Sequence, residues 1–168
     1  RWIARVDRLL AVLAGLALVA AFASVMLGVV ARLAGWDVPG TDAYAGYAIA
    51  AALFLALPQT LRRSEHIRVT LLLEKLPPRG RTALQWWSMG AGLALALFIA
   101  FYAVRLVWVS QDMHDVSQGA DATPLWIPQI AMALGCIGFA LSMADALWCR
   151  LRGAAYFHRI GAEASHVE

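Results

Sequence analysis

Asp112, His114 and Asp115 stand close together in the sequence, and they are the group of side chains best suited to bind a metal ion or transfer a proton. Carboxylates and an imidazole can ligate a divalent metal ion, but metal centres usually also take ligands from well-separated positions, and none accompany this group. Glu65 and His66 adjoin a run of basic residues, where a histidine commonly caps a helix or lies at a membrane surface. The first group is interpreted as polar loop residues, with metal binding as the less favoured alternative, and His66 is interpreted as an interfacial or capping residue.

The two cysteines do not indicate redox chemistry. Cys136 and Cys149 fall on one predicted helix, whose rise of 1.5 Å per residue separates them by about 20 Å, too far for a disulfide. The sequence has no glycine-rich phosphate loop, no cysteine pair at metal-ligand spacing and no nucleophile elbow. We therefore expect this chain to have no catalytic residues, no cofactor and no metal of its own.

The composition indicates a membrane protein. Of the 168 residues, 61% are hydrophobic and 15% are charged, and the mean hydropathy is +0.65. About a quarter of the residues in an average soluble domain are charged. Four uncharged runs reach the length of about 20 residues that a membrane-spanning helix needs. These runs are residues 9–31, 43–61, 82–104 and 124–144.

These runs predict an all-α integral membrane protein with four transmembrane helices. The first run is longer than the core of a signal peptide, so it is expected to remain as a helix. A single membrane domain is predicted for residues 1–153, followed by a polar cytoplasmic tail at residues 154–168.

The basic residues predict the orientation. All but two of the 14 Lys and Arg residues lie before the first span, between the second and third spans, or after the fourth. The two opposite loops contain aspartates but no Lys or Arg. The positive-inside rule then places both termini in the cytoplasm, an N-in/C-in topology. Because the basic residues flank membrane spans, lipid head groups are better partners for them than nucleic acid.

Tryptophans gather at the same two boundaries. Indole rings favour the headgroup region, and none of the tryptophans falls in the middle of a predicted span. Six are interpreted as membrane anchors: Trp2, Trp86, Trp87 and Trp148 on the inner side, and Trp36 and Trp108 on the outer side.

Charged residues avoid the centres of the spans. Arg32 and Arg105 are predicted at the outer ends of their helices and Asp145 at an inner end, where long side chains can reach the interface. An ion pair between helices, or a contact with another subunit, is the alternative for each. Ion and proton pathways usually need charges near the bilayer centre. The chain alone is therefore not expected to be a complete transporter.

Small residues on the later spans predict close helix packing, within this chain or against another. Gly90 and Gly92 lie on the third span, and Gly135 and Gly138 on the fourth. Pro58, near the end of the second span, is expected to kink the helix before the cytoplasmic connection.

The connection between the second and third spans has its own pattern. Val69, Leu72, Leu73 and Leu76 follow the i, i+3, i+4, i+7 spacing of an amphipathic helix, and the prolines that follow end it. We expect a short helix at residues 66–76 that lies in the inner interface, either as a simple linker or as a brace for a partner subunit.

The chain resembles the DctQ-like small membrane subunit of tripartite ATP-independent periplasmic (TRAP) transporters over nearly its whole length. Three patterns, in this order and topology, support the resemblance: Asp42 before the second helix; Arg63, then His66, Ile67 and Val69, then Leu76-Pro77; and Thr123-Pro124-Leu125-Trp126-Ile127-Pro128 with Gly135 after it. The sequence departs from the family at Thr70, where an acidic residue is common, and at Leu57-Pro58, where small residues are common.

The resemblance implies a bacterial inner-membrane protein that pairs with a large multi-helix subunit. That large subunit is expected to bind sodium and to move an organic acid by an elevator motion. A periplasmic binding protein would deliver the substrate, and this chain would act as a scaffold. The acidic outer loops, with Asp112, Asp115 and Asp121, could meet the binding protein through charge complementarity.

Two other functions remain alternatives. A subunit of a membrane-bound enzyme or electron-transfer complex would need haem ligands on its helices, and none of the four histidines falls in mid-span. A small channel or exporter would need a polar lining, and the spans offer only scattered Ser, Thr and Gln residues.

Overall fold

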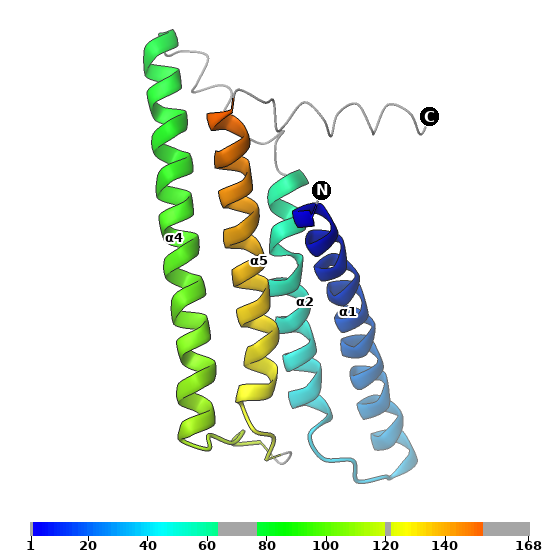
Figure 1. Ribbon diagram of the computed structural model, residues 1–168. Coiled ribbons are helices and arrows are strands. Elements are labelled where there is room, and N and C mark those ends of the chain that lie inside the picture. Colours follow the sequence, from blue (N-terminus) through cyan, green and yellow to red (C-terminus); the bar gives the residue numbers. More distant parts are fainter. Residues whose placement is uncertain (1, 64–76, 120–121, 153–168) are drawn as a thin grey trace, which may run out of the picture.

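A computed structural model describes residues 2–63, 77–119 and 122–152 of the chain (Figure 1). These residues form four long helices: α1 (Trp2–Ala34), α2 (Thr41–Arg63), α4 (Pro78–Asp112) and α5 (Trp126–Leu151). Each of the four is long and apolar enough to cross a membrane, and the described residues include no strand longer than one bridge. The predicted all-α fold with four transmembrane helices is therefore confirmed. The predicted helix at residues 66–76 and the tail at 154–168 lie outside the described residues, and the N-in/C-in topology stays a prediction.

The helices extend beyond the predicted spans at most of their ends. At 1.5 Å per residue, α1 and α4 are each about 50 Å long, whereas the hydrocarbon core of a bilayer is about 30 Å thick. Hydropathy reports only the apolar part, but a helix continues until its backbone is interrupted. Gly35, with φ of 71°, follows α1, and Pro77 precedes α4.

The fourth helix begins later than predicted. The apolar run starts at Pro124, but α5 starts at Trp126 because the two residues before it belong to the preceding loop. Pro124 bridges to Val116, and the backbone N–H of Leu125 donates to the carbonyl oxygen of Asp115 at 3.0 Å.

The four helices stand in a row, in the order α4, α5, α2, α1 (Figure 1). α5 packs against α4 on one side and α2 on the other, and α1 packs mainly against α2, with a smaller contact to α5. One end of the row holds the start of α1, the ends of α2 and α5 and the start of α4 (top of Figure 1). We call this the terminal end. The opposite end carries residues 35–40, 113–119 and 122–125 of the connections, and we call it the loop end. The row makes α1 and α4 edge helices.

Each edge helix is buried along one narrow stripe. In α1 the buried residues follow steps of three, four and seven: Asp7, Leu10, Ala14, Ala21, Gly28 and Ala31. In α4 they follow the same spacing: Met89, Ala96, Ala100, Ala103 and Ser110. Such a stripe is the seam of a two-helix contact, and small residues on it let the backbones approach closely. Most of the remaining large apolar side chains of both helices are exposed.

The central contact, between α2 and α5, depends on two glycines. A Cβ at Gly135 would overlap the backbone carbonyl of Phe54, and one at Gly138 would meet Leu10 and the ring of Pro58. Close packing at these two positions therefore occurs within this chain. Gly90, by contrast, has no atom near the place where its Cβ would stand. Pro58 lies inside α2 and is fully buried.

Candidate functional site

No group of three or more His, Cys, Asp or Glu side chains in the described part of the chain is arranged to hold a metal ion. Asp112 and Asp115 are exposed at the loop end. Between them, His114 has φ of 53°, and its Nδ1 lies 3.1 Å from the backbone carbonyl oxygen of Asp112. Both cysteines are free thiols. The chemically interesting contacts are those that join one helix to another.

At the loop end, an ion pair joins α1 to α2. Arg32 Nη2 lies 2.8 Å from Oδ2 of Asp42, which stands in the first turn of α2. An acidic side chain is favourable at a helix N-terminus and a basic one at a C-terminus, so each residue suits its own helix end as well as its partner. Asp42, predicted as a family motif residue, thus has a partner, and the interhelical alternative holds for Arg32. Arg105 instead lies over the ring of Tyr102, 6.0 Å from its centroid.

The predicted motif before the fourth helix also connects two elements. The Thr123 hydroxyl donates to the hydroxyl oxygen of Tyr44 on α2 at 3.2 Å. Pro124 then bridges to Val116, Trp126 is the first residue of α5, and Pro128 stands in its first turn, where a missing N–H costs no helical bond. The motif therefore ends the loop, starts α5 and ties it to α2.

At the terminal end, a buried hydrogen bond joins α1 to α5. Ser142 Oγ donates to Oδ1 of Asp7 at 2.8 Å, and both residues are almost fully enclosed. A buried carboxylate needs such partners because removal from water is costly. The sequence alone did not lead us to predict a role for Asp7. The signal was present, because Asp7 is the one acid in a basic segment and stands three residues before Leu10 on the buried stripe.

A second contact at the terminal end joins α4 to α5. Arg150, in the last turn of α5, donates from Nη2 to Oε1 of Gln85 and from Nη1 to the sulfur of Met89, the latter at 3.7 Å. Its guanidinium also lies over the ring of Trp86, 5.3 Å from the centroid. The predicted inner-end acid, Asp145, accepts a weak hydrogen bond from the Cys149 thiol at 4.0 Å.

The six tryptophans predicted as anchors are all exposed, as side chains facing lipid have to be: Trp2, Trp36, Trp86, Trp87, Trp108 and Trp148. At 1.5 Å per residue, Trp87 and Trp108 on α4 stand about 32 Å apart, close to the thickness of a hydrocarbon core. Their contact with head groups stays a prediction.

The motif in the central connection is only partly described. Arg63 is the last residue of α2, and Pro77 is the N-cap of α4, with φ of −61° and ψ of 154°. His66, Ile67 and Val69 lie outside the described residues, as does Asp121 of the proposed docking loop.

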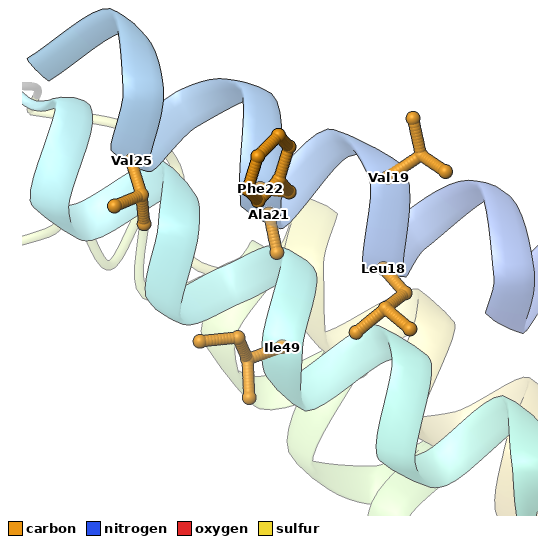
Figure 2. Close-up of a pocket in the computed structure, with 6 residues that line it drawn as sticks. All are labelled: Leu18, Val19, Ala21, Phe22, Val25 and Ile49. Carbon is orange, nitrogen blue, oxygen red and sulfur yellow. The ribbon is translucent and has the colours of Figure 1, made fainter.

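An apolar groove of about 550 Å³ runs along α1 where it faces α2 (Figure 2). Ile49 lines it from α2, and α1 contributes the other lining residues, Leu18, Val19, Ala21, Phe22 and Val25. The lining side chains are all apolar, so the groove suits a hydrocarbon chain or an apolar side chain and offers nothing to bind a polar substrate.

The row of apolar helices, its exposed tryptophans and its interhelical polar contacts define a multi-pass α-helical membrane protein. The family model described as "Tripartite ATP-independent periplasmic transporters, DctQ component" matches residues 21–153. The chain therefore belongs to the DctQ component family of TRAP transporters, as the resemblance in its motifs predicted. A comparison with curated proteins gave no match.

Proposed function

We propose that this chain is the small membrane subunit that supports the large transport subunit of a TRAP-type secondary transporter. The observation that carries the proposal is the family match over residues 21–153. The DctQ family is a family of transporter components and not of enzymes, which disfavours the enzyme or electron-transfer alternative. The contacts of Arg32, Ser142 and Arg150 join helices of this chain to one another, which suits a scaffold.

The row of helices suits a supporting role for a physical reason. An elevator transporter moves one domain across the bilayer while another stays fixed, and additional spans would widen the fixed part. The two edge helices expose large apolar side chains along most of their length, such as Phe22 and Leu33 on α1 and Phe101 on α4. Lipid or the helices of a larger subunit would cover these surfaces.

The finer proposal follows the family. The chain would lie in the bacterial inner membrane, with the terminal end in the cytoplasm. The large subunit would couple sodium to the uptake of an organic acid, and a periplasmic binding protein would deliver the acid. Asp112 and Asp115, exposed at the loop end, would meet the binding protein through charge complementarity.

Uptake in proteoliposomes tests the proposal. The large subunit and the cognate binding protein are reconstituted with and without this chain, and uptake of an organic acid is measured under a sodium gradient. We expect uptake only with the chain present, and none from the chain alone. Equal uptake in its absence would show that the transporter does not need it.

A charge variant tests the docking proposal separately. Asp112→Asn with Asp115→Asn should raise the binding-protein concentration needed for half-maximal uptake, because complementary charges chiefly increase the association rate. The maximal rate at saturating binding protein should not change. An unchanged half-maximal concentration at low salt would remove these two aspartates from the docking surface.

A further inference from the structure

Arg150 is a half-buried cation without a carboxylate partner in the described part of the chain. Its side chain leaves the last turn of α5 and enters the space beside α4. The salt bridge found among residues 2–63, 77–119 and 122–152 joins Arg32 to Asp42, far away at the loop end. The nearest acid on its own helix, Asp145, accepts from the Cys149 thiol. Holding a cation partly out of water is unfavourable unless an anion compensates it.

The groups that contact Arg150 in the described part of the chain position it without neutralising it. Gln85 Oε1 and the sulfur of Met89 accept from its two terminal nitrogens, and its guanidinium carbon lies 5.3 Å from the centroid of the Trp86 ring. A guanidinium has five N–H donors in one plane, so these two hydrogen bonds leave donors for another acceptor. The planar set of donors matches the oxygens of a phosphate. A cation–π contact with an aromatic ring also helps to hold the guanidinium in place.

The position of Arg150 along α5 indicates which kind of phosphate the site would meet. At 1.5 Å per residue, Trp126 and Trp148 stand about 33 Å apart along α5, roughly the thickness of a hydrocarbon core. Arg150 lies just beyond Trp148 and beside Trp86. It therefore stands at the level of the phospholipid phosphates at the terminal end, which the basic residues predict to be cytoplasmic.

We propose that Arg150, with Gln85 and Trp86, forms a binding site for the phosphate of an anionic phospholipid in the cytoplasmic leaflet. The head group would supply a negative charge between α4 and α5 that no residue in the described part of the chain provides, and the acyl chains would lie along the exposed apolar surface of α4. The lipid would thereby strengthen the attachment of α4, which packs through a single narrow stripe. The inference does not depend on the transport function.

Arg152 provides a matched control. It stands at the same end of α5 and also lies over an indole, with 4.7 Å between its guanidinium carbon and the centroid of the Trp148 ring. It is exposed, however, and contacts a residue of its own helix instead of a second helix. Arg150→Gln and Arg152→Gln remove the same charge from the same leaflet, but only the first removes the proposed site.

Native mass spectrometry of the full chain, titrated with phosphatidylglycerol and with phosphatidylcholine, measures the binding. The wild type should bind phosphatidylglycerol preferentially. Arg150→Gln should weaken phosphatidylglycerol binding by about tenfold, the effect of losing a charge-assisted hydrogen bond, and Arg152→Gln by less than about twofold. Equal losses in the two variants, or no preference between the two lipids, would overturn the proposal.

A competition with inorganic phosphate distinguishes a lipid site from a site for soluble phosphate. Inorganic phosphate should not displace phosphatidylglycerol, because it lacks acyl chains. Displacement at millimolar concentration would assign the site to a soluble phosphate and overturn the lipid assignment.

A conservative variant and a stability measurement distinguish lost lipid binding from a folding defect. Arg150→Lys keeps the positive charge but loses the planar N–H donors of the guanidinium, so it should retain part of the preference for phosphatidylglycerol. In nanodiscs, phosphatidylglycerol should raise the melting temperature of the wild type above its value in phosphatidylcholine. Loss of that increase in Arg150→Gln, but not in Arg152→Gln, supports the proposal, and an increase that survives in both contradicts it.

Discussion

α5 packs against α2 and α4 in different ways. Toward α2, Gly135 and Gly138 leave no room for a Cβ, and backbone atoms of Phe54 approach the helix directly. Toward α4, the contact is lined by alanines and Cys136, and Ala96, Ala100 and Ala103 of α4 form one stripe of it. The buried hydrogen bond from Ser142 to Asp7 adds α1 to the α2 side.

This difference indicates which part of the molecule is held most rigidly. Transmembrane helices gain little from the hydrophobic effect on association, so close packing and interhelical hydrogen bonds determine how firmly they join. Gly135 and Gly138 provide the close packing and Asp7 provides the interhelical hydrogen bond, so α1, α2 and α5 form one unit. α4 is attached to that unit through a stripe of small residues and through the hydrogen bonds that Arg150 donates to Gln85 and Met89. Its glycine at this contact, Gly92, meets the flexible end of the Met143 side chain and not a backbone. Substitutions on the α2 side of α5 should therefore cost more stability than comparable substitutions elsewhere.

Gly135→Ala should have the largest effect. The new methyl group would overlap a backbone carbonyl, which cannot rotate away, so the helices must separate, at a cost of about 3 kcal/mol. Unfolding of the purified chain in detergent measures the loss. Gly90→Ala on α4 is the matched control, because open space surrounds Gly90. It should be neutral or slightly stabilising, since alanine favours a helix. Equal effects of the two substitutions would refute the difference between the two sides of α5.

Gly138→Ala should cost less, about 1–2 kcal/mol, because the nearest atom it meets is the end of the flexible Leu10 side chain. A double-mutant cycle with Leu10→Ala sharpens the test. The second substitution makes room for the new methyl group, so the pair should be coupled by at least about 0.5 kcal/mol. Strict additivity in the same unfolding assay would mean that α1 does not pack on Gly138.

The hydrogen bond between Asp7 and Ser142 should contribute about 1 kcal/mol, within the range measured for interhelical hydrogen bonds in membrane proteins. Asp7→Ala and Ser142→Ala, alone and together, isolate this coupling energy. Ser88→Ala is a suitable control, because the Ser88 hydroxyl is bonded within its own helix to the carbonyl of Gln85. A coupling near zero between Asp7 and Ser142 would mean that this hydrogen bond does not contribute to the rigidity of the α2 side.

The fold class could be predicted from the sequence because hydropathy and length alone determine whether a helix can span a bilayer. The order of the helices in the row could not. Small residues such as Gly135 predict a close contact between helices, but they do not determine which helix makes it, since alanine and glycine on any helix allow another helix to come equally close. The start of α5 could not be read from the apolar run either, because Pro124 is as apolar as the span that follows it but bridges to the loop.

The candidate contacts were predictable where a charge had a nearby partner in the sequence. An interhelical ion pair was an open alternative for Arg32, and its partner, Asp42, lies just across one short connection. Asp7 and Ser142 lie on the first and last helices, and only the packing of those helices brings them together. The partners of Arg150 likewise come from another helix, and the basic pattern of the sequence predicted its side of the membrane but not its neighbours.

The ion pair between Arg32 and Asp42 should show the smallest effect, although it is also a short contact between two helices. Both side chains are largely exposed, 71% for Arg32 and 84% for Asp42, so water and salt screen their attraction. Arg32→Gln or Asp42→Asn should therefore lower stability by only about 0.5 kcal/mol, and high salt should remove even that difference. Unfolding at low and high salt measures both quantities, with Arg105→Gln as the control for loss of an exposed arginine. A salt-resistant loss as large as that of Gly135→Ala would show that the loop end, and not the glycine contact, holds the row together.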